Sequence, residues 1–326
     1  MIYRPAATLF LFCAVASAQE RPAILVDQLG YLPDEKKIAI IRDLRAELVE
    51  VRNTVTNKTV YTGKVKGVGR RDESTGDETF LFDFSELINP GNYQLWIPGT
   101  EVASTEFSIG PDVYLEAALS SLQSFYYQRC GIEVSNGSPW VHPPCHLQDA
   151  LQYGSPSHRN DVVGGWHDAG DYGKFVATGA VSAAFLLYLY ELKPSKFVDG
   201  QLAIPQAGNS IPDILDEVRW ELEWLLKMQR EDGGVYHKVS TKKWTGEYLP
   251  HRDPDKRYIF EVSSTATGAF AAVTALASRH YQRWDKPFAQ QLLRAAVQAW
   301  EYLEAHPTIV PRGGFRNPSD VEGGEY

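Results

Sequence analysis

The chain has 326 residues, of which 44% are hydrophobic and 22% are charged, and its formal net charge is −9 at pH 7. This balance is that of folded globular proteins, and the length allows two domains. The negative charge argues against a nucleic-acid partner, because phosphate backbones are bound through clustered lysine and arginine side chains.

The first eighteen residues predict a secretory leader. Arg4 precedes a short apolar stretch, Ala6–Ala16, and Ala16-Ser17-Ala18 forms a small-residue cleavage site before Gln19. The apolar stretch is too short to span a bilayer, and no other stretch approaches the length of a membrane helix. We therefore expect a secreted protein, extracellular or periplasmic, with no membrane contact after the leader is removed.

Residues 19–110 predict an all-β domain. Short strand-like runs alternate with Gly, Pro, Asp and Asn clusters at the spacing of a small antiparallel sandwich. Gly67–Asp77 is polar and contains glycine, so we expect a long exposed loop there. No exposed aromatic platform is evident, which favours a structural role for this domain. Strands are expected at Ala23–Asp27, Lys37–Arg42, Glu47–Val51, Thr79–Phe84, Asn92–Ile97 and Thr105–Ile109.

From residue 111 the pattern changes to helices joined by irregular loops. Pro111 and Asp112 favour a helix start, because proline suits the first turn and an acid suits the positive end of the helix dipole. No closing element follows Arg316, so we expect the chain to end within this domain. Further helices are expected at Thr178–Leu192, Pro212–Gln229, Ser264–Trp284 and Pro287–His306.

The segment Gly164–Phe175 carries two carboxylates, Asp168 and Asp171, in a glycine-rich loop before an apolar helix. Glycine lets the backbone turn tightly and bring both side chains to one side. Two neighbouring carboxylates can hold a water molecule and accept its proton. A capping Asp and a solvated Asp would account for an isolated Asp-x-x-Asp pattern, but the composition of the whole segment favours catalysis.

Cys130, Cys145, His146 and His167 form a second candidate group. One interpretation is a Cys130–Cys145 disulfide, which export favours. The other is a tetrahedral structural zinc site with two cysteine and two histidine ligands, with His158 as a substitute for the fourth. The residues alone leave both open.

The Gly164–Phe175 segment resembles the catalytic-base motif of family 9 glycoside hydrolases. Ile24–Pro33 resembles the opening strand of the immunoglobulin-like domain that precedes many of these catalytic domains. The resemblance covers essentially the whole chain after the leader. It implies an immunoglobulin-like β-sandwich followed by an incomplete (α/α)6 barrel at residues 111–326. Further similar segments are Phe125–Gly131, Cys145-His146, Ser263–Gly268 and Gly323–Tyr326.

The resemblance implies a role for each carboxylate. Asp171 matches the general base that activates the attacking water, and Asp168 matches the carboxylate that helps to hold it. The family's general acid is a Glu in an Asn-Glu motif, and this sequence has no such dipeptide; Glu322 and Glu325 match an earlier segment. We therefore expect the acid to lie beyond Tyr326.

The resemblance also favours zinc over the disulfide at the Cys/His group, and it allows calcium, for which we find no complete acidic ligand set. It places His237, Lys238 and Trp244 along the sugar cleft, although a surface loop accounts for them equally well. The acids of Asp213–Glu217 are expected to form a helix start and a solvated face.

The implied activity is hydrolysis of β-1,4-glucosidic bonds in cellulose or related β-glucans, with inversion, by an endoglucanase that acts as a monomer. The alternatives are an exo-acting β-glucosidase or glucosaminidase of the same family, or a non-catalytic carbohydrate-binding protein on this scaffold. The pair Asp168 and Asp171 argues against a pure binder, because binding does not require a water-activating pair.

Overall fold

The computed structural model describes residues 21–244 and 246–322, and the chain divides into two compact units, Met1–Ala117 and Ala118–Tyr326. The predicted leader and the Gly323–Tyr326 segment lie outside the described residues. Within the described ranges, no helix combines the length and the apolar character that a membrane crossing requires.

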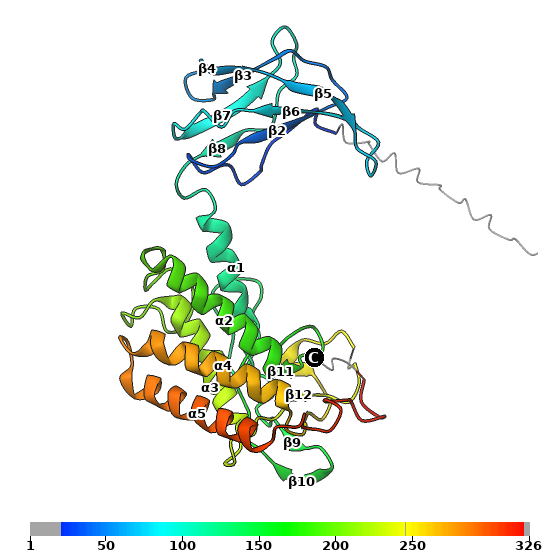
Figure 1. The fold of residues 1–326 in the computed structure, drawn as a ribbon, viewed down its shortest axis with the longest axis vertical. Helices are drawn as coiled ribbons and strands as arrows, with labels where there is room; N and C mark the ends of the chain where they lie inside the picture. The colour runs from blue at the N-terminus through cyan, green and yellow to red at the C-terminus, as the bar shows by residue number, and fades with distance from the viewer. Residues whose placement is uncertain (1–20, 245, 323–326) are drawn as a thin grey trace, which may run out of the picture. The chain divides into compact units, whose positions relative to one another are not determined.

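The first unit is a β-sandwich of two four-stranded sheets, with strand orders β1-β2-β6-β5 and β4-β3-β7-β8 (Figure 1). All strand pairs within these sheets are antiparallel. The strands are β1 (Ile24–Leu25), β2 (Ile38–Arg42), β3 (Leu48–Asn53), β4 (Thr59–Lys64), β5 (Lys66–Arg71), β6 (Glu78–Asp83), β7 (Gly91–Trp96) and β8 (Phe107–Ile109).

Alternation along the strands builds the sandwich core. In β6, Phe80 and Phe82 are buried while Leu81 between them is 51% exposed, because successive side chains of a strand point to opposite faces. Val49 and Val51 of β3 supply the same core from the second sheet.

The predicted loop at Gly67–Asp77 is wrong for its first part, since Lys66–Arg71 forms strand β5 and pairs with β6. The sequence did not indicate this strand, because glycines and cationic residues stand where a strand would show alternating apolar residues. Charged residues suit an edge strand, where they discourage pairing with other chains. Strand β4 was also not predicted; its residues are mostly exposed, so they carry no apolar alternation.

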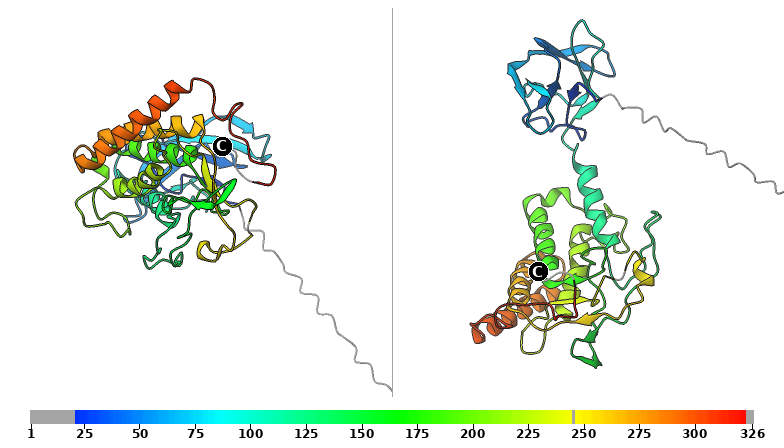
Figure 2. Two further views of the ribbon diagram at one scale, coloured as in Figure 1. Left: turned by 90° about the horizontal axis from the view of Figure 1, so that it is seen from below. Right: turned by 90° about the vertical axis from the view of Figure 1, so that its right-hand side faces the viewer.

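Helices are the longest elements of the second unit. Figures 1 and 2 show α4 and α5 as an antiparallel pair, and both α3 and α4 pack against α2. A sheet of short strands, in the order β10-β9-β13-β12-β11, ties the loops of this unit together. The helices are α1 (Leu115–Tyr127), which crosses the boundary between the units, α2 (Val176–Leu192), α3 (Asp213–Lys227), α4 (Ser264–Tyr281) and α5 (Lys286–Ala305). The short elements are β9 (Leu151–Gln152), β10 (Ser155–Arg159), β11 (Lys174–Phe175), β12 (Lys238–Ser240), β13 (Tyr258–Ile259) and the 3₁₀ turns η1 (Pro194–Lys196) and η2 (Pro250–Arg252).

The helices begin close to the predicted positions, with one clear shift. Pro111 and Asp112 do not open α1, which begins at Leu115 after a turn. Capping side chains fix two other starts: Ser263 accepts from the Ala266 amide before α4, and Asp285 accepts from the Phe288 amide before α5. The predicted fold class, a β-sandwich followed by a helical array, is confirmed.

Candidate active site

The loop that carries Asp168 and Asp171 closes on itself. The Asp168 amide donates to the Gly173 carbonyl at 2.8 Å, and the Tyr172 amide donates to the Ala169 carbonyl at 2.9 Å. Strand β11 follows at once and pairs with β12. The two carboxylates therefore sit on a tight loop that is anchored to the small sheet at its end.

Each carboxylate is held by one oxygen. Oδ1 of Asp168 accepts from the Thr178 hydroxyl at 2.8 Å, and Oδ1 of Asp171 accepts from the Gly173 amide at 3.1 Å. Among the residues that the structure describes, Oδ2 of neither side chain has a hydrogen-bond partner. One oxygen on each carboxylate thus remains for a water molecule or a ligand.

Trp244 lies against this loop. A Cβ added at Gly170 would stand 3.3 Å from the Trp244 ring, and Trp244 is 59% exposed. The Tyr172 hydroxyl donates to the Tyr248 carbonyl, which joins the same two segments a second time. The structure thus brings the predicted sugar-cleft residue Trp244 next to the carboxylate loop, with its ring open to solvent.

His237 and Lys238 are buried, so the surface-loop interpretation is wrong for both. The His237 ring stacks on Phe315 with centroids 3.7 Å apart, and its Nδ1 lies 2.8 Å from the Ser263 hydroxyl. Lys238 donates to Asn317 at 2.7 Å. The Gly233-Gly234 turn that precedes them suggested a surface loop, but the chain passes from that turn directly into β12.

Cys130, Cys145, His146 and His167 come together as predicted, with one potential ligand atom from each within 4.8 Å of the others. Cys130 Sγ lies 3.7 Å from His146 Nδ1, Cys145 Sγ lies 3.8 Å from His167 Nε2, and the two histidine nitrogens are 3.2 Å apart. Both cysteines are free and buried. His158 is exposed on β10 and does not belong to the group.

These separations fit a tetrahedral metal. With zinc–sulfur bonds of about 2.3 Å and zinc–nitrogen bonds of about 2.0–2.1 Å, sulfur and nitrogen ligands stand about 3.5 Å apart and two nitrogens about 3.3 Å apart. The observed distances lie within about 0.3 Å of these values. The buried Cys/His cluster can therefore hold a metal ion.

The surroundings support the cluster as a ligand set. His146 turns its other nitrogen, Nε2, to Asp253 Oδ2 at 3.3 Å, an arrangement that fixes the tautomer of a metal-binding histidine. Lys174 Nζ lies 3.6 Å from Cys130 Sγ. Although burial raises the pKa of the Cys130 thiol, its hydrogen bond to Cys145 and the charges of Lys174 and His167 bring that pKa well below its usual range.

The expected solvated face at Asp213–Glu217 is wrong, because the acids of this segment are buried. Asp213 accepts from the Gly200 and Leu202 amides at 3.1 and 2.6 Å and so orders the loop before α3. Glu217 forms a buried bidentate pair with Arg129. Within the described ranges, the Cys/His cluster is the one group of metal-binding side chains that meets close together, and calcium stays a prediction.

Sequence reasoning missed Glu221, which is fully buried on α3. Its Oε2 accepts from the Trp166 amide at 2.7 Å. Burial raises the pKa of Glu221 to about 8, although the Trp166 hydrogen bond and the Lys174 charge act in the opposite direction. The available signal was the placement of Glu217 and Glu221 one helical turn apart, which puts both on one face of α3.

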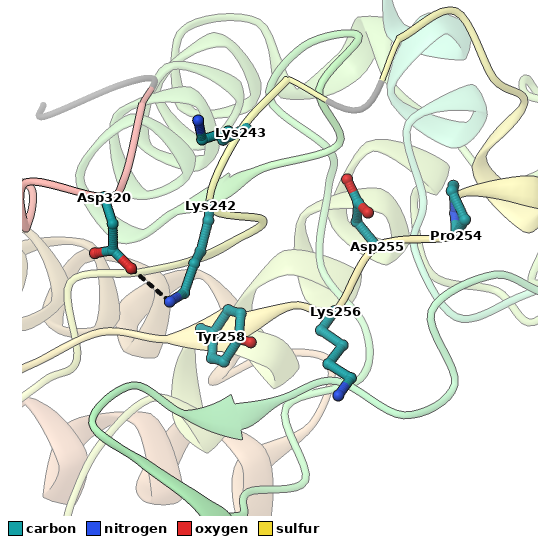
Figure 3. A pocket seen from close by; sticks show the side chains of 7 residues that line it. All are labelled: Lys242, Lys243, Pro254, Asp255, Lys256, Tyr258 and Asp320. Carbon is teal, nitrogen blue, oxygen red and sulfur yellow. Dashed lines mark hydrogen bonds and ion pairs between the residues drawn. The ribbon is translucent and has the colours of Figure 1, made fainter.

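Two cavities differ in their relation to the carboxylates. A small cavity of about 150 Å³ lies between α1, α2 and the loop, and Asp168, Trp166 and Thr178 line it. A larger one of about 560 Å³ (Figure 3) contains neither carboxylate; Lys242 pairs there with Asp320 at 2.5 Å. Figure 3 labels its lining residues, Lys242, Lys243, Pro254, Asp255, Lys256, Tyr258 and Asp320.

Comparisons with known proteins give a consistent result. Residues 114–326 match the family described as glycosyl hydrolase family 9, and residues 19–102 match the cellulase N-terminal ig-like domain. The chain is 37% identical to the cellodextrinase of Butyrivibrio fibrisolvens over 93% of its own length and 55% of the relative's. It is 35% identical to endoglucanase D of Acetivibrio thermocellus, over 93% of the chain and 48% of that protein.

A solved structure agrees with these relatives. The crystal structure of a metagenome-derived glycoside hydrolase family 9 endoglucanase superposes with a TM-score of 0.79 at 37% identity, covering 93% of this chain and 57% of that one. The chain thus spans about half the length of the proteins that it matches.

Proposed function

Because this chain belongs to glycosyl hydrolase family 9, we propose that it hydrolyses β-1,4-glucosidic bonds in cellulose or related β-glucans with inversion at the anomeric carbon. The observation that carries the proposal is the closed loop with Asp168 and Asp171, each with a free Oδ2, beside the exposed ring of Trp244.

In the proposed mechanism, Asp171 accepts a proton from the water that attacks the anomeric carbon, and Asp168 holds that water. Thr178 keeps Asp168 in place through its hydroxyl. Inversion also needs a carboxylic acid about 6.5–9.5 Å from the base, which protonates the leaving oxygen. We assign none of the described residues to that acid.

We propose that Trp244 stacks on a sugar ring of the substrate, since an exposed indole next to the base offers an apolar face to a pyranose. His237 and Lys238, in contrast, are buried. Their burial and their contacts with Phe315 and Asn317 give them a supporting role.

The Cys/His cluster is proposed to bind zinc. Cys130, Cys145, His146 and His167 would hold it, and when bound it supplies a structural cross-link between the end of α1 and the carboxylate loop. The protein residues do the rest: Asp253 orients His146, and Lys174 balances the charge near Cys130.

Endo-acting hydrolysis is the first candidate, and an exo-acting enzyme on short glucans is the second. The endoglucanase among the relatives supports the first candidate, and the cellodextrinase supports short glucans as the substrate of the second. The proposal further places the protein outside the cytoplasm as a monomer, with the predicted leader as support. The sandwich acts as a structural support for the catalytic unit.

The test is hydrolysis by the natural full-length protein, followed by NMR from the first seconds of reaction. We expect the α-anomer to form first from β-1,4-linked cello-oligosaccharides. In Asp171→Asn, turnover should fall by about 10²–10⁴-fold while sugar binding persists. Initial release of the β-anomer would contradict inversion, and binding without any hydrolysis by the unaltered protein would indicate a carbohydrate-binding protein instead. Chain-length analysis of the products separates endo from exo action.

A further inference from the structure

One face of α3 holds the segment Gly164–Trp166, which leads into the carboxylate loop. An indole on α3 donates to the Gly165 carbonyl at 3.1 Å. A second indole packs so closely that a Cβ at Gly165 would stand 2.6 Å from it, and Gly165 has a φ of 74°. Glycine is therefore required at this position. The residues of this face are Glu217, Trp220, Glu221 and Trp224, at helical spacing i, i+3, i+4 and i+7.

Both N–H groups of Trp166 are held by carboxylates of this face. Its indole Nε1 donates to Glu217 at 2.8 Å, and its backbone amide donates to Glu221 at 2.7 Å. Trp166 lies directly before His167 of the Cys/His cluster and two residues before Asp168. The two glutamates thus fix the backbone at the start of the carboxylate loop.

The two glutamates differ in their charge partners. Glu217 and Arg129 form an ion pair at 2.9 Å in which both side chains are fully buried. No ion pair to Glu221 occurs in the part of the chain that the structure describes, and its polar contact is the Trp166 amide. A buried carboxyl without a cation costs free energy. Glu217 thus has a cation beside it, whereas Glu221 has the Trp166 amide alone among the described residues.

Glu221 also reaches α2. A Cβ added at Gly179 would collide with Oε1 of Glu221, so the carboxyl lies directly against this glycine. The preceding residue, Thr178, donates its hydroxyl to Asp168. A single carboxyl therefore contacts the backbone that leads into Asp168 and the helical turn that carries the hydrogen-bond donor of Asp168.

We propose that Glu221 is a positioning residue for the carboxylate pair, an inference that rests on the proposed function of Asp168 and Asp171. It sets the position of Asp168 from both sides without touching the reacting atoms. A displacement of about 1 Å at a catalytic group can lower turnover by about 10²-fold. Glu221 should accordingly affect kcat and leave substrate binding unchanged.

The experiment compares three variants of the natural full-length protein. Glu221→Met removes the acceptor, and kcat should fall about 10–100-fold with KM within about twofold. Glu221→Gln keeps an oxygen that can accept from the Trp166 amide, and its kcat should return to within about threefold. Glu223→Gln is the matched control, because Glu223 is on the same helix but exposed and paired with Arg219 at 2.7 Å; its kcat should not change.

Hydrogen–deuterium exchange gives a readout that does not depend on activity. We expect Glu221→Met to speed exchange at residues 164–171, and Glu221→Gln to leave it near the unaltered rate. Unchanged exchange and kcat in Glu221→Met would overturn the inference, as would a fall in kcat that only follows lost metal or a lower Tm. If the unaltered protein cleaves no β-glucan, the proposed function fails, and the exchange comparison still decides the position of the loop.

Discussion

The two units of the molecule bury different kinds of side chain. Among the described residues of the sandwich, the buried polar side chains are those of Lys37, Asp77 and Ser104. Lys37 donates to three backbone carbonyls of the adjacent turn. The helical unit buries many ionisable groups, some of which form ion pairs with one another. They include Arg129, Asp149, Lys174, Asp213, Asp216, Glu217, Glu221, Lys238 and Arg257.

The difference in buried side chains reflects a different role for each unit. Buried charge is costly unless it is paired, so a core made for stability alone avoids it. In the helical unit several of these ionisable groups lie around the start of the carboxylate loop. Lys174 contacts Asp149 at 2.8 Å and Cys130 at 3.6 Å, and Glu217 and Glu221 accept hydrogen bonds from Trp166. The sandwich is thus a packing unit, and the polar core of the helical unit organises a site.

Metal removal should cause the largest loss of stability, and only the helical unit should be destabilised. Structural zinc contributes on the order of 10 kcal/mol in small zinc domains. We expect about one zinc per chain, and we expect a chelator to lower the Tm of the helical unit while the sandwich transition stays in place. Calorimetry and metal analysis measure both.

The chain offers a matched pair for this test. His146→Ala should lose the zinc, whereas His158→Ala, which alters an exposed histidine outside the cluster, should keep it. Mass spectrometry that finds an intact Cys130–Cys145 bridge without zinc would contradict the metal site and restore the disulfide.

Two core substitutions, one in each unit, should lower the free energy of unfolding by similar amounts and so separate stability from activity. Arg129→Met leaves Glu217 buried without its cation, which typically costs about 3–5 kcal/mol. Phe82→Ala empties part of the sandwich core, with a loss of about 3–5 kcal/mol. Urea unfolding should show both losses, but only Arg129→Met should lower kcat at temperatures where the protein is folded. Equal loss of kcat in both variants would show that the sandwich also shapes the site.

A smaller effect concerns pH. The folded pKa of Glu221, about 8, lies above its ordinary value of 4.5, so the folded state binds the extra proton between these values. Stability from this group is therefore present below about pH 4.5 and is lost as the pH rises toward 8. The free energy of unfolding of the unaltered protein should fall relative to Glu221→Gln over this range, by a few kcal/mol at most. Parallel pH profiles would contradict the raised pKa.

The sequence predicted the parts of the site whose chemistry is local. Cys145 and His146 are neighbours along the chain, and the structure brings them together with Cys130 and His167. Asp168 and Asp171 are close in sequence too and lie on one tight loop, where their catalytic roles stay a prediction. The buried acids of α3 could not be predicted in this way. A charged residue is predicted to be exposed to solvent unless a buried partner of opposite charge is known. Glu217 pairs with Arg129, which is 88 positions away in the sequence. Strand β5 was missed for a similar reason, since its pairing with β6 outweighs its polar composition.

The most direct test of the account is chemical rescue of Asp171→Asn in the natural full-length protein. Azide is a small anion that can attack the anomeric carbon without a base, so it should restore cleavage of a β-linked substrate and form an α-glycosyl azide. The same treatment should leave the unaltered protein unchanged. If Asp171→Asn keeps near-normal turnover while Asp168→Asn abolishes it, or if azide yields the β-glycosyl azide, the assignment of Asp171 as the base of an inverting hydrolase is contradicted.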